Sequence, residues 1–203
     1  LNLNGTATTT TITQVGQNAR YTFTGTAGQW VSLGMTGVTI TASTVLLVRP
    51  DGTTWLSMSV GTTGNSLDSP TALPTTGTYA VIVNPIAQYT GTMTVTLSTD
   101  VTGTLTINAA ATPVTLSRVG RNARYTFNGM AGQQVTVRVT GNTLSSTTVN
   151  LYTPSGSYQT GTNSSAASFN LTPVTLATTG TYTVTVNPTD LTTGSLNLQV
   201  TSP

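Results

Sequence analysis

Side chains that can do acid–base or metal chemistry are scarce in this sequence of 203 residues. It contains no histidine, cysteine, lysine or glutamate, and its acidic side chains are Asp51, Asp68, Asp100 and Asp190. Catalysis requires a group that exchanges protons near neutral pH, an activated nucleophile or a metal ion. Because Ser/His/Asp and Ser/Lys arrangements cannot be built here, we predict that the chain is not an enzyme and has no catalytic residue.

The aspartates are also poorly spaced for a shared or metal-bound role. An aspartic dyad needs two carboxylates in one site, and the four aspartates are far apart in the sequence. Zinc would have only aspartate ligands, although it prefers nitrogen and sulfur. We therefore expect neither a metal site nor a cofactor.

The charge of the chain argues against nucleic acid as a partner, and its hydropathy argues against a membrane-spanning helix. The six basic residues are all arginine, and the formal net charge is only +2. Nucleic-acid binding depends on several clustered cations, and only Arg118, Arg121 and Arg124 are close together in the sequence. No apolar run approaches the roughly 20 residues of a membrane-spanning helix. We predict no nucleic acid among the partners and no membrane span.

The sequence repeats itself once, and this repeat sets its organisation. Gly16–Phe23 returns almost unchanged as Gly120–Phe127, at an offset of 104 residues. Thr75–Tyr79 returns as Thr178–Tyr182, at an offset of 103 residues. The second copy has therefore lost one residue, which we place in a loop between Gly52 and Thr75 because loops absorb deletions most easily.

The two copies predict two domains, residues 1–100 and 101–203. Both ends of the chain resemble the junction between the copies. The last residues, 193–200, are similar to residues 90–97, which precede that junction. We interpret the sequence as part of a longer array of repeats.

Alternation of apolar and polar residues marks strands in both copies, because side chains on a strand point alternately to its two faces. Turn signals separate these segments, and no window has a helical period. About seven or eight short strands per copy predict two sheets packed face to face, an all-β fold. The residues predicted to point inward are Ala19, Tyr21, Phe23, Val31, Leu33, Met35, Tyr79, Val81, Val83, Met93, Val95, Leu97, Tyr125, Phe127, Val135, Val137, Val139, Tyr182, Val184, Val186, Leu196, Leu198 and Val200.

The same ordered motifs occur in each copy: Tyr-x-Phe, Ala-Gly-Gln-x-Val, Pro-x-Gly, Thr-Gly-Thr-Tyr-x-Val-x-Val, and Thr-Gly before the last strand. This pattern resembles the bacterial pre-peptidase C-terminal family, which implies two tandem jelly-roll-like β-sandwich domains. Such modules accompany secreted proteases, surface adhesins and polymorphic-toxin proteins. Similar clostridial collagen-binding domains bind calcium through clustered acidic residues. Here Ser155 stands where the first copy has Asp51, so calcium is not expected.

Apolar residues of the first copy occupy positions that the strand phase turns outward. These are Trp30, Leu46 and Ile82, where the second copy has Gln134, Asn150 and Thr185. Exposed apolar patches usually mark interaction sites, so the substitutions favour a partner or ligand face. The alternative is that a neighbouring module or a long loop covers these residues.

Two further aromatics, Trp55 and Tyr89, lie in segments with the composition of turns. An aromatic ring in such a place can stack on a sugar, and more commonly it packs as a lid over the core. Both interpretations stay open at this point.

These observations predict a non-catalytic structural or adhesive repeat module of a large secreted or surface-displayed bacterial protein, acting as a spacer or a self-associating unit. The expected partners are neighbouring repeats of the same protein or like subunits, with an extracellular glycan or matrix as a further candidate. The alternative function is a glycan- or collagen-binding module.

Overall fold

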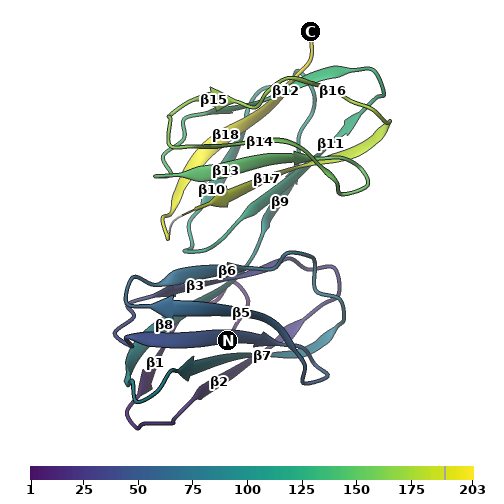
Figure 1. Ribbon diagram of the computed structural model, residues 1–203. Helices are drawn as coiled ribbons and strands as arrows, with labels where there is room; N and C mark the ends of the chain where they lie inside the picture. Colours follow the sequence, from purple (N-terminus) through teal and green to yellow (C-terminus); the bar gives the residue numbers. More distant parts are fainter. Residues whose placement is uncertain (190) are drawn as a thin grey trace. The chain divides into compact units, whose positions relative to one another are not determined.

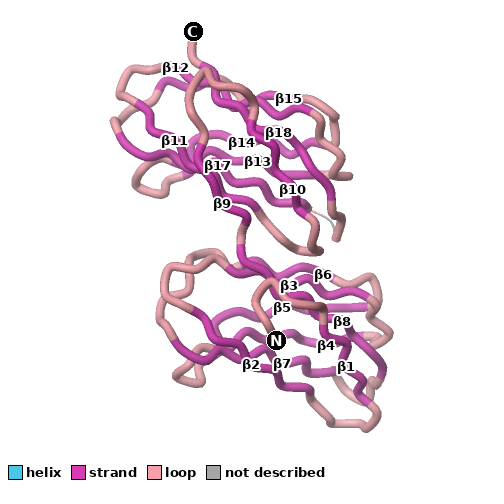
Figure 2. Tube along the Cα trace, turned by 180° about the vertical axis from the view of Figure 1, so that it is seen from behind, coloured by secondary structure: helices cyan, strands magenta, loops and turns pink. Residues whose placement is uncertain are grey.

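The computed structural model describes residues 1–189 and 191–203, and these residues form eighteen strands and no helix. Strands and loops fill both units in Figures 1 and 2. The chain divides into two compact units. One comprises Leu1–Thr99 with Arg118–Gly120, and the other comprises Asp100–Ser117 with Arg121–Pro203. The predicted all-β class is confirmed.

The first unit contains two four-stranded antiparallel sheets, with strand orders β1-β8-β3-β6 and β2-β7-β4-β5. This is the order of an eight-stranded jelly roll, in which two sheets face each other. The strands are β1 (Thr8–Ile12), β2 (Ala19–Gly25), β3 (Val31–Thr36), β4 (Ala42–Val48), β5 (Thr54–Gly61), β6 (Asn65–Asp68), β7 (Gly77–Pro85) and β8 (Gly91–Thr99).

The second unit repeats this topology and adds two short strands. Its sheets have the orders β10-β18-β12-β15, with β16 pairing to β12, and β14-β13-β17-β11-β9. The strands are β9 (Val101–Thr104), β10 (Thr112–Leu116), β11 (Ala123–Gly129), β12 (Gln134–Thr140), β13 (Thr147–Tyr152), β14 (Tyr158–Ser164), β15 (Phe169–Asn170), β16 (Val174–Thr175), β17 (Gly180–Pro188) and β18 (Gly194–Thr201). The predicted jelly-roll-like sandwich is confirmed.

Each unit encloses its own apolar core, built from the inner faces of both of its sheets. All of the residues predicted to point inward are buried except Ala19 and Tyr21, which are half-buried near the start of β2. Burial of one such large apolar side chain contributes roughly 1.5–3 kcal/mol to the free energy of unfolding. The alternating pattern therefore fixes which face of each strand turns inward, since a slip of one residue would expose the whole set.

The single-residue gap between the copies lies in the connection from β6 to β7. Leu67 lies opposite Leu33 in the sheet, and Leu171, which is 104 residues further on, donates its backbone N–H to Val137 O. Leu73 N donates to Gln29 O, and its equivalent Leu176, which is 103 residues further on, donates to Gln133 O. The offset changes between these two leucines, within the predicted interval from Gly52 to Thr75.

The chain crosses the second unit from one end to the other. β9 runs parallel to β11, with Val101 beside Ala123 at the start of that strand. β18 finishes with Thr201 beside Thr136, near the start of β12. Because only four residues join the end of β11 to the start of β12, in the facing sheet, the starts of these two strands lie at opposite ends of the unit.

The loop between β7 and β8 holds one alanine in the left-handed region, Ala87, with φ of 54°. This conformation costs an L-residue roughly 1–2 kcal/mol, and asparagine tolerates it better. We expect Ala87→Asn to raise the free energy of unfolding of the first unit by about 0.5–1 kcal/mol. Urea titration followed by tryptophan fluorescence measures this unit alone, because both tryptophans belong to it. Ala27→Asn, at an exposed position outside the left-handed region, is the control and should change little.

Candidate interaction surfaces

Two of the predicted interaction residues form a pair on the outside of the first unit. Leu46 of β4 lies directly opposite Ile82 of β7, and both are half-buried. Their row continues with the exposed Arg20 of β2, opposite Ile82. In the second unit the same row holds Asn150 opposite Thr185. That a partner contacts the apolar pair stays a prediction.

Trp30 does not join this pair. It directly precedes β3, in the other sheet of the same unit, and its side chain is half-buried. Trp30 also has an interaction partner in the chain. The structure therefore brings Leu46 and Ile82 together and places Trp30 on a different sheet.

Trp55 lies in β5, so the prediction that it belongs to a turn-like segment is wrong. The register between β4 and β5 shifts next to Leu47, which leaves Trp55 as the extra residue of a β-bulge. A bulge re-aims a side chain, and Trp55 packs against the core. Its ring centroid lies 6.3 Å from that of Tyr79, and the Arg49 guanidinium lies 5.8 Å from it. This geometry favours the packing lid over the sugar platform.

Tyr89 lies in the loop between β7 and β8 and keeps 37% of its side chain exposed. Two further exposed apolar residues were not predicted: Ile86, in the same loop, at 47%, and Val15, in the loop after β1, at 65%. Their loops leave the sandwich at the same end, because Ile12, which ends β1, lies opposite Gly91, which starts β8. A position-by-position comparison of the two copies could have found Ile86, since the second copy has threonine at the equivalent position.

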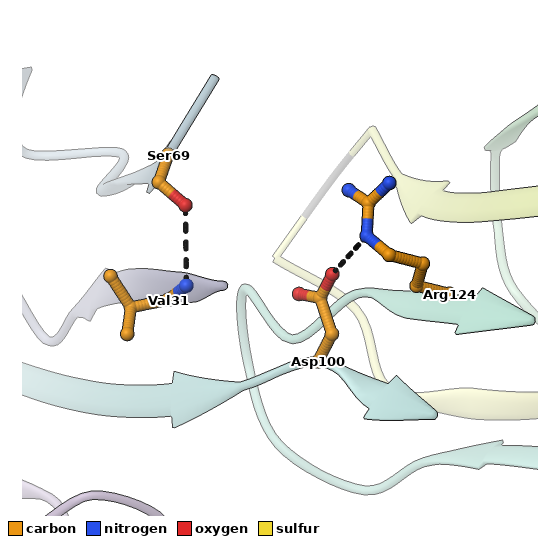
Figure 3. A network of polar contacts seen from close by, with 4 residues as sticks. All are labelled: Val31, Ser69, Asp100 and Arg124. Carbon is orange, nitrogen blue, oxygen red and sulfur yellow. Dashed lines mark hydrogen bonds and ion pairs between the residues drawn. The ribbon is translucent and has the colours of Figure 1, made fainter. Parts of the chain in front are cut away.

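The second unit contains an ion pair in which one partner is almost completely buried. Arg124 Nε lies 3.3 Å from Asp100 Oδ2, with side-chain exposures of 23% for the arginine and 5% for the aspartate. Figure 3 shows this contact, together with the hydrogen bond from Val31 N to Ser69 Oγ in the first unit. The buried Asp100 carboxylate therefore has a structural role.

Asp51 closes a turn and lies far from this ion pair in the sequence. Its Oδ1 accepts hydrogen bonds from the Thr53 hydroxyl and the Thr53 backbone N–H, at 2.6 and 2.9 Å. These bonds, the hydroxyl first, lower the pKa of the Asp51 carboxyl below its usual value. In the second unit hydroxyl groups take over, since Ser155 Oγ lies 2.9 Å from Thr153 Oγ1. Asp51 thus has a local structural role.

Part of the second copy is similar to a known protein family. Residues 121–188 match the family model described as "Bacterial pre-peptidase C-terminal domain". The matched segment lies within the second copy. The resemblance inferred from the motifs is therefore confirmed for this segment.

Solved structures show weaker similarity. The pre-peptidase C-terminal domain of collagenase from Bacillus anthracis is 18% identical, over 50% of this chain and 95% of that chain, with a TM-score of 0.41. PliG from Aeromonas hydrophila, a periplasmic lysozyme inhibitor of g-type lysozyme, is 17% identical over 50% of this chain and 95% of that chain, with a TM-score of 0.34. No curated protein matches the chain.

Within the matched segment, the motif tyrosine hydrogen-bonds to the backbone four residues earlier in the chain. Tyr182 Oη donates to Thr178 O at 2.8 Å, and in the first unit Tyr79 Oη donates to Thr75 O at the same distance. Each buried tyrosine ring also stacks on a phenylalanine of the neighbouring strand, with ring centroids 5.5 Å apart. The phenolic oxygen is thereby satisfied while the ring fills the core, as buried tyrosine requires.

Two other repeated motifs are in contact within each unit. A Cβ atom on Gly180 would lie 2.8 Å from Pro154 Cγ, and one on Gly77 would lie 2.7 Å from Pro50 Cγ. The glycine of Thr-Gly-Thr-Tyr is therefore required by the proline of Pro-x-Gly. The motif residues that carry the family resemblance pack the module together.

Tyr182→Phe should lower the free energy of unfolding of the second unit by about 1–2 kcal/mol, because it removes the hydrogen bond to the Thr178 carbonyl. Urea titration followed by far-UV circular dichroism measures this. Tyr158→Phe is the matched control, since Tyr158 is 61% exposed and should tolerate the change. Equal stability of the two variants would show that the bond contributes nothing.

The described residues contain no group of three or more acidic, histidine or cysteine side chains close enough to hold a metal ion. That no metal and no cofactor binds stays a prediction. In the part of the chain that the structure describes, no helix is long and apolar enough to span a bilayer.

Proposed function

We propose that the chain is a pair of tandem copies, residues 1–100 and 101–203, of a non-catalytic structural repeat in a large secreted or surface-displayed bacterial protein. The observation that carries this is the path of the backbone, which crosses the second unit from one end to the other. A module traversed in this way adds length to an array. The match of residues 121–188 to the pre-peptidase C-terminal family also supports a non-catalytic accessory role.

A pulling force on the second unit would act on its first and last strands, β9 and β18, and the way in which these strands are paired supports a spacer role. β9 pairs along β11, and β18 pairs on both sides, with β10 and β12. Ladder hydrogen bonds lie across the strands, so a force along β9 and β18 loads several of them at once. Such a unit should resist extension better than one whose hydrogen bonds open one by one.

A glycan- or collagen-binding module is the second candidate. Tyr89 and Ile86 support it, because they present apolar surface on one exposed loop. A self-associating unit would use the same surface or the Leu46–Ile82 pair.

Binding of the full chain to immobilised collagen and to a glycan array separates these roles. A spacer should show no saturable binding to either. Saturable binding that Tyr89→Ala abolishes would favour the binding module and contradict the spacer. Arg20→Ala, on the exposed row beside Ile82, is a control for non-specific charge effects.

A further inference from the structure

Two tyrosine rings are in contact in the second unit, at the hairpin that joins β13 to β14. The ring centroids of Tyr152 and Tyr158 lie 6.2 Å apart, with an angle of 79° between the ring planes. In such an arrangement the edge of one ring points at the face of the other. The other tyrosines of the described residues that contact an aromatic ring pack on phenylalanine or tryptophan. Tyr152 and Tyr158 are therefore distinguished as a pair of neighbouring phenols.

Strand pairing holds the two tyrosines together. Tyr152 ends β13 and lies opposite Tyr158, which begins β14. The register shifts after Leu151, which leaves Gln159 as the extra residue of a β-bulge. Two residues before Tyr152 on the same strand, Asn150 donates from Nδ2 to Tyr152 Oη at 3.4 Å. The pair is thus fixed by a folded hairpin.

The rings differ in their access to solvent. Tyr158 is 61% exposed. Tyr152 is half-buried, on the face of β13 opposite to that of the buried Leu151. An exposed side chain changes rotamer within nanoseconds, so the Tyr158 ring can turn toward Tyr152 without movement of either strand. The hairpin therefore combines one ring held in place with one that is free to approach it.

The first copy has no such pair. Val48 and Thr54 are the equivalents of Tyr152 and Tyr158 at the offset of 104 residues, and they also lie opposite each other beside a register shift. The chain contains neither cysteine nor lysine, so it can form neither a disulfide nor an isopeptide bond through lysine. A bond between two tyrosine rings is a covalent link between strands that the side chains of the β13–β14 hairpin do allow.

We propose that Tyr152 and Tyr158 form an oxidative cross-linking site, at which a haem peroxidase and hydrogen peroxide join the two rings as dityrosine. Each phenol gives up one electron and one proton, and the resulting radical is shared with the carbons ortho to the hydroxyl group. One ortho carbon of each ring forms the new C–C bond. The hydrogens on these two carbons then move to the phenolic oxygens, which restores both phenols. One hydrogen peroxide accepts the two electrons and two protons and becomes two water molecules.

The cross-link would fasten the outermost strand of a sheet. β14 stands at the end of its sheet and pairs with β13 alone. A bond between Tyr152 and Tyr158 would hold this edge strand to its one neighbour after the hydrogen bonds between them open. The inference goes beyond the proposed function and does not depend on it, because it concerns one hairpin of the second unit.

Peroxidase treatment of the full chain at low protein concentration tests the site. We expect dityrosine fluorescence in the monomeric chain, whose mass falls by two hydrogen atoms. Mass spectrometry of a thermolysin digest should place the bond between Tyr152 and Tyr158. The yield should not depend on protein concentration, because neighbouring rings of one chain react as a single molecule. Oxidation of the exposed Met130 is told apart by mass, since a sulfoxide gains an oxygen atom.

Three conservative variants identify the rings, with far-UV circular dichroism to verify that each is folded. Tyr152→Phe and Tyr158→Phe should each lower the dityrosine fluorescence of the monomer about tenfold, because the remaining phenol loses its fixed neighbour. Tyr89→Phe removes an exposed tyrosine of the first unit and should leave the fluorescence unchanged. Dityrosine that is absent from the treated monomer, or that survives Tyr152→Phe there, would overturn the proposal. Either result would leave the mechanical test of the spacer unaffected.

Discussion

Arg124→Ala should lower the free energy of unfolding of the second unit by about 3 kcal/mol, because it leaves a buried carboxylate with one cationic partner fewer. Asp100 is only 5% exposed, so water cannot replace the lost contact without rearrangement. Far-UV circular dichroism during urea titration reports the change. Tryptophan fluorescence, which comes only from the first unit, gives the companion measurement.

Arg20→Ala is the matched control for this substitution. Arg20 occupies the equivalent position of the first copy, on β2, and is exposed. Its removal should change stability by less than about 0.5 kcal/mol. Similar losses for both variants would mean that the effect comes from the strand position and that the ion pair contributes little.

Leu47→Ala should destabilise the first unit by about 2–5 kcal/mol, through lost burial and the cavity that remains. Leu47 is 2% exposed and belongs to the core. Its neighbour Leu46 points to the other side of the same strand, so Leu46→Ala should cost about 1 kcal/mol or less. Tryptophan fluorescence in urea measures both variants. Equal losses would contradict the assignment of Leu46 to the outer face.

Strand phase could be predicted from this sequence because the two copies test each other. Val31, Leu33 and Met35 alternate as Val135, Val137 and Val139 do, and all six are buried. Burial of one face leaves a single register that hides them all. The jelly-roll order was available only through the family resemblance, since alternation alone does not state which strands pair.

The candidate surface was harder to predict. Trp55 was misplaced because a bulge adds one residue to β5, and a bulge has no signature in the alternation of residue types. Trp30 and the Leu46–Ile82 pair were grouped by phase, but phase does not show which of two sheets a strand joins. Val15 was missed because its exposure depends on what packs against the loop, which the sequence of the loop does not contain.

Forced unfolding of the single chain tests whether it contains two independent load-bearing modules in series. We expect two separate force peaks, each releasing about one hundred residues at up to roughly 3.3–3.6 Å per residue. Tyr182→Phe should weaken one peak and leave the other unchanged. A single peak that releases the whole chain, or extension without a peak, would contradict the proposal of two load-bearing modules.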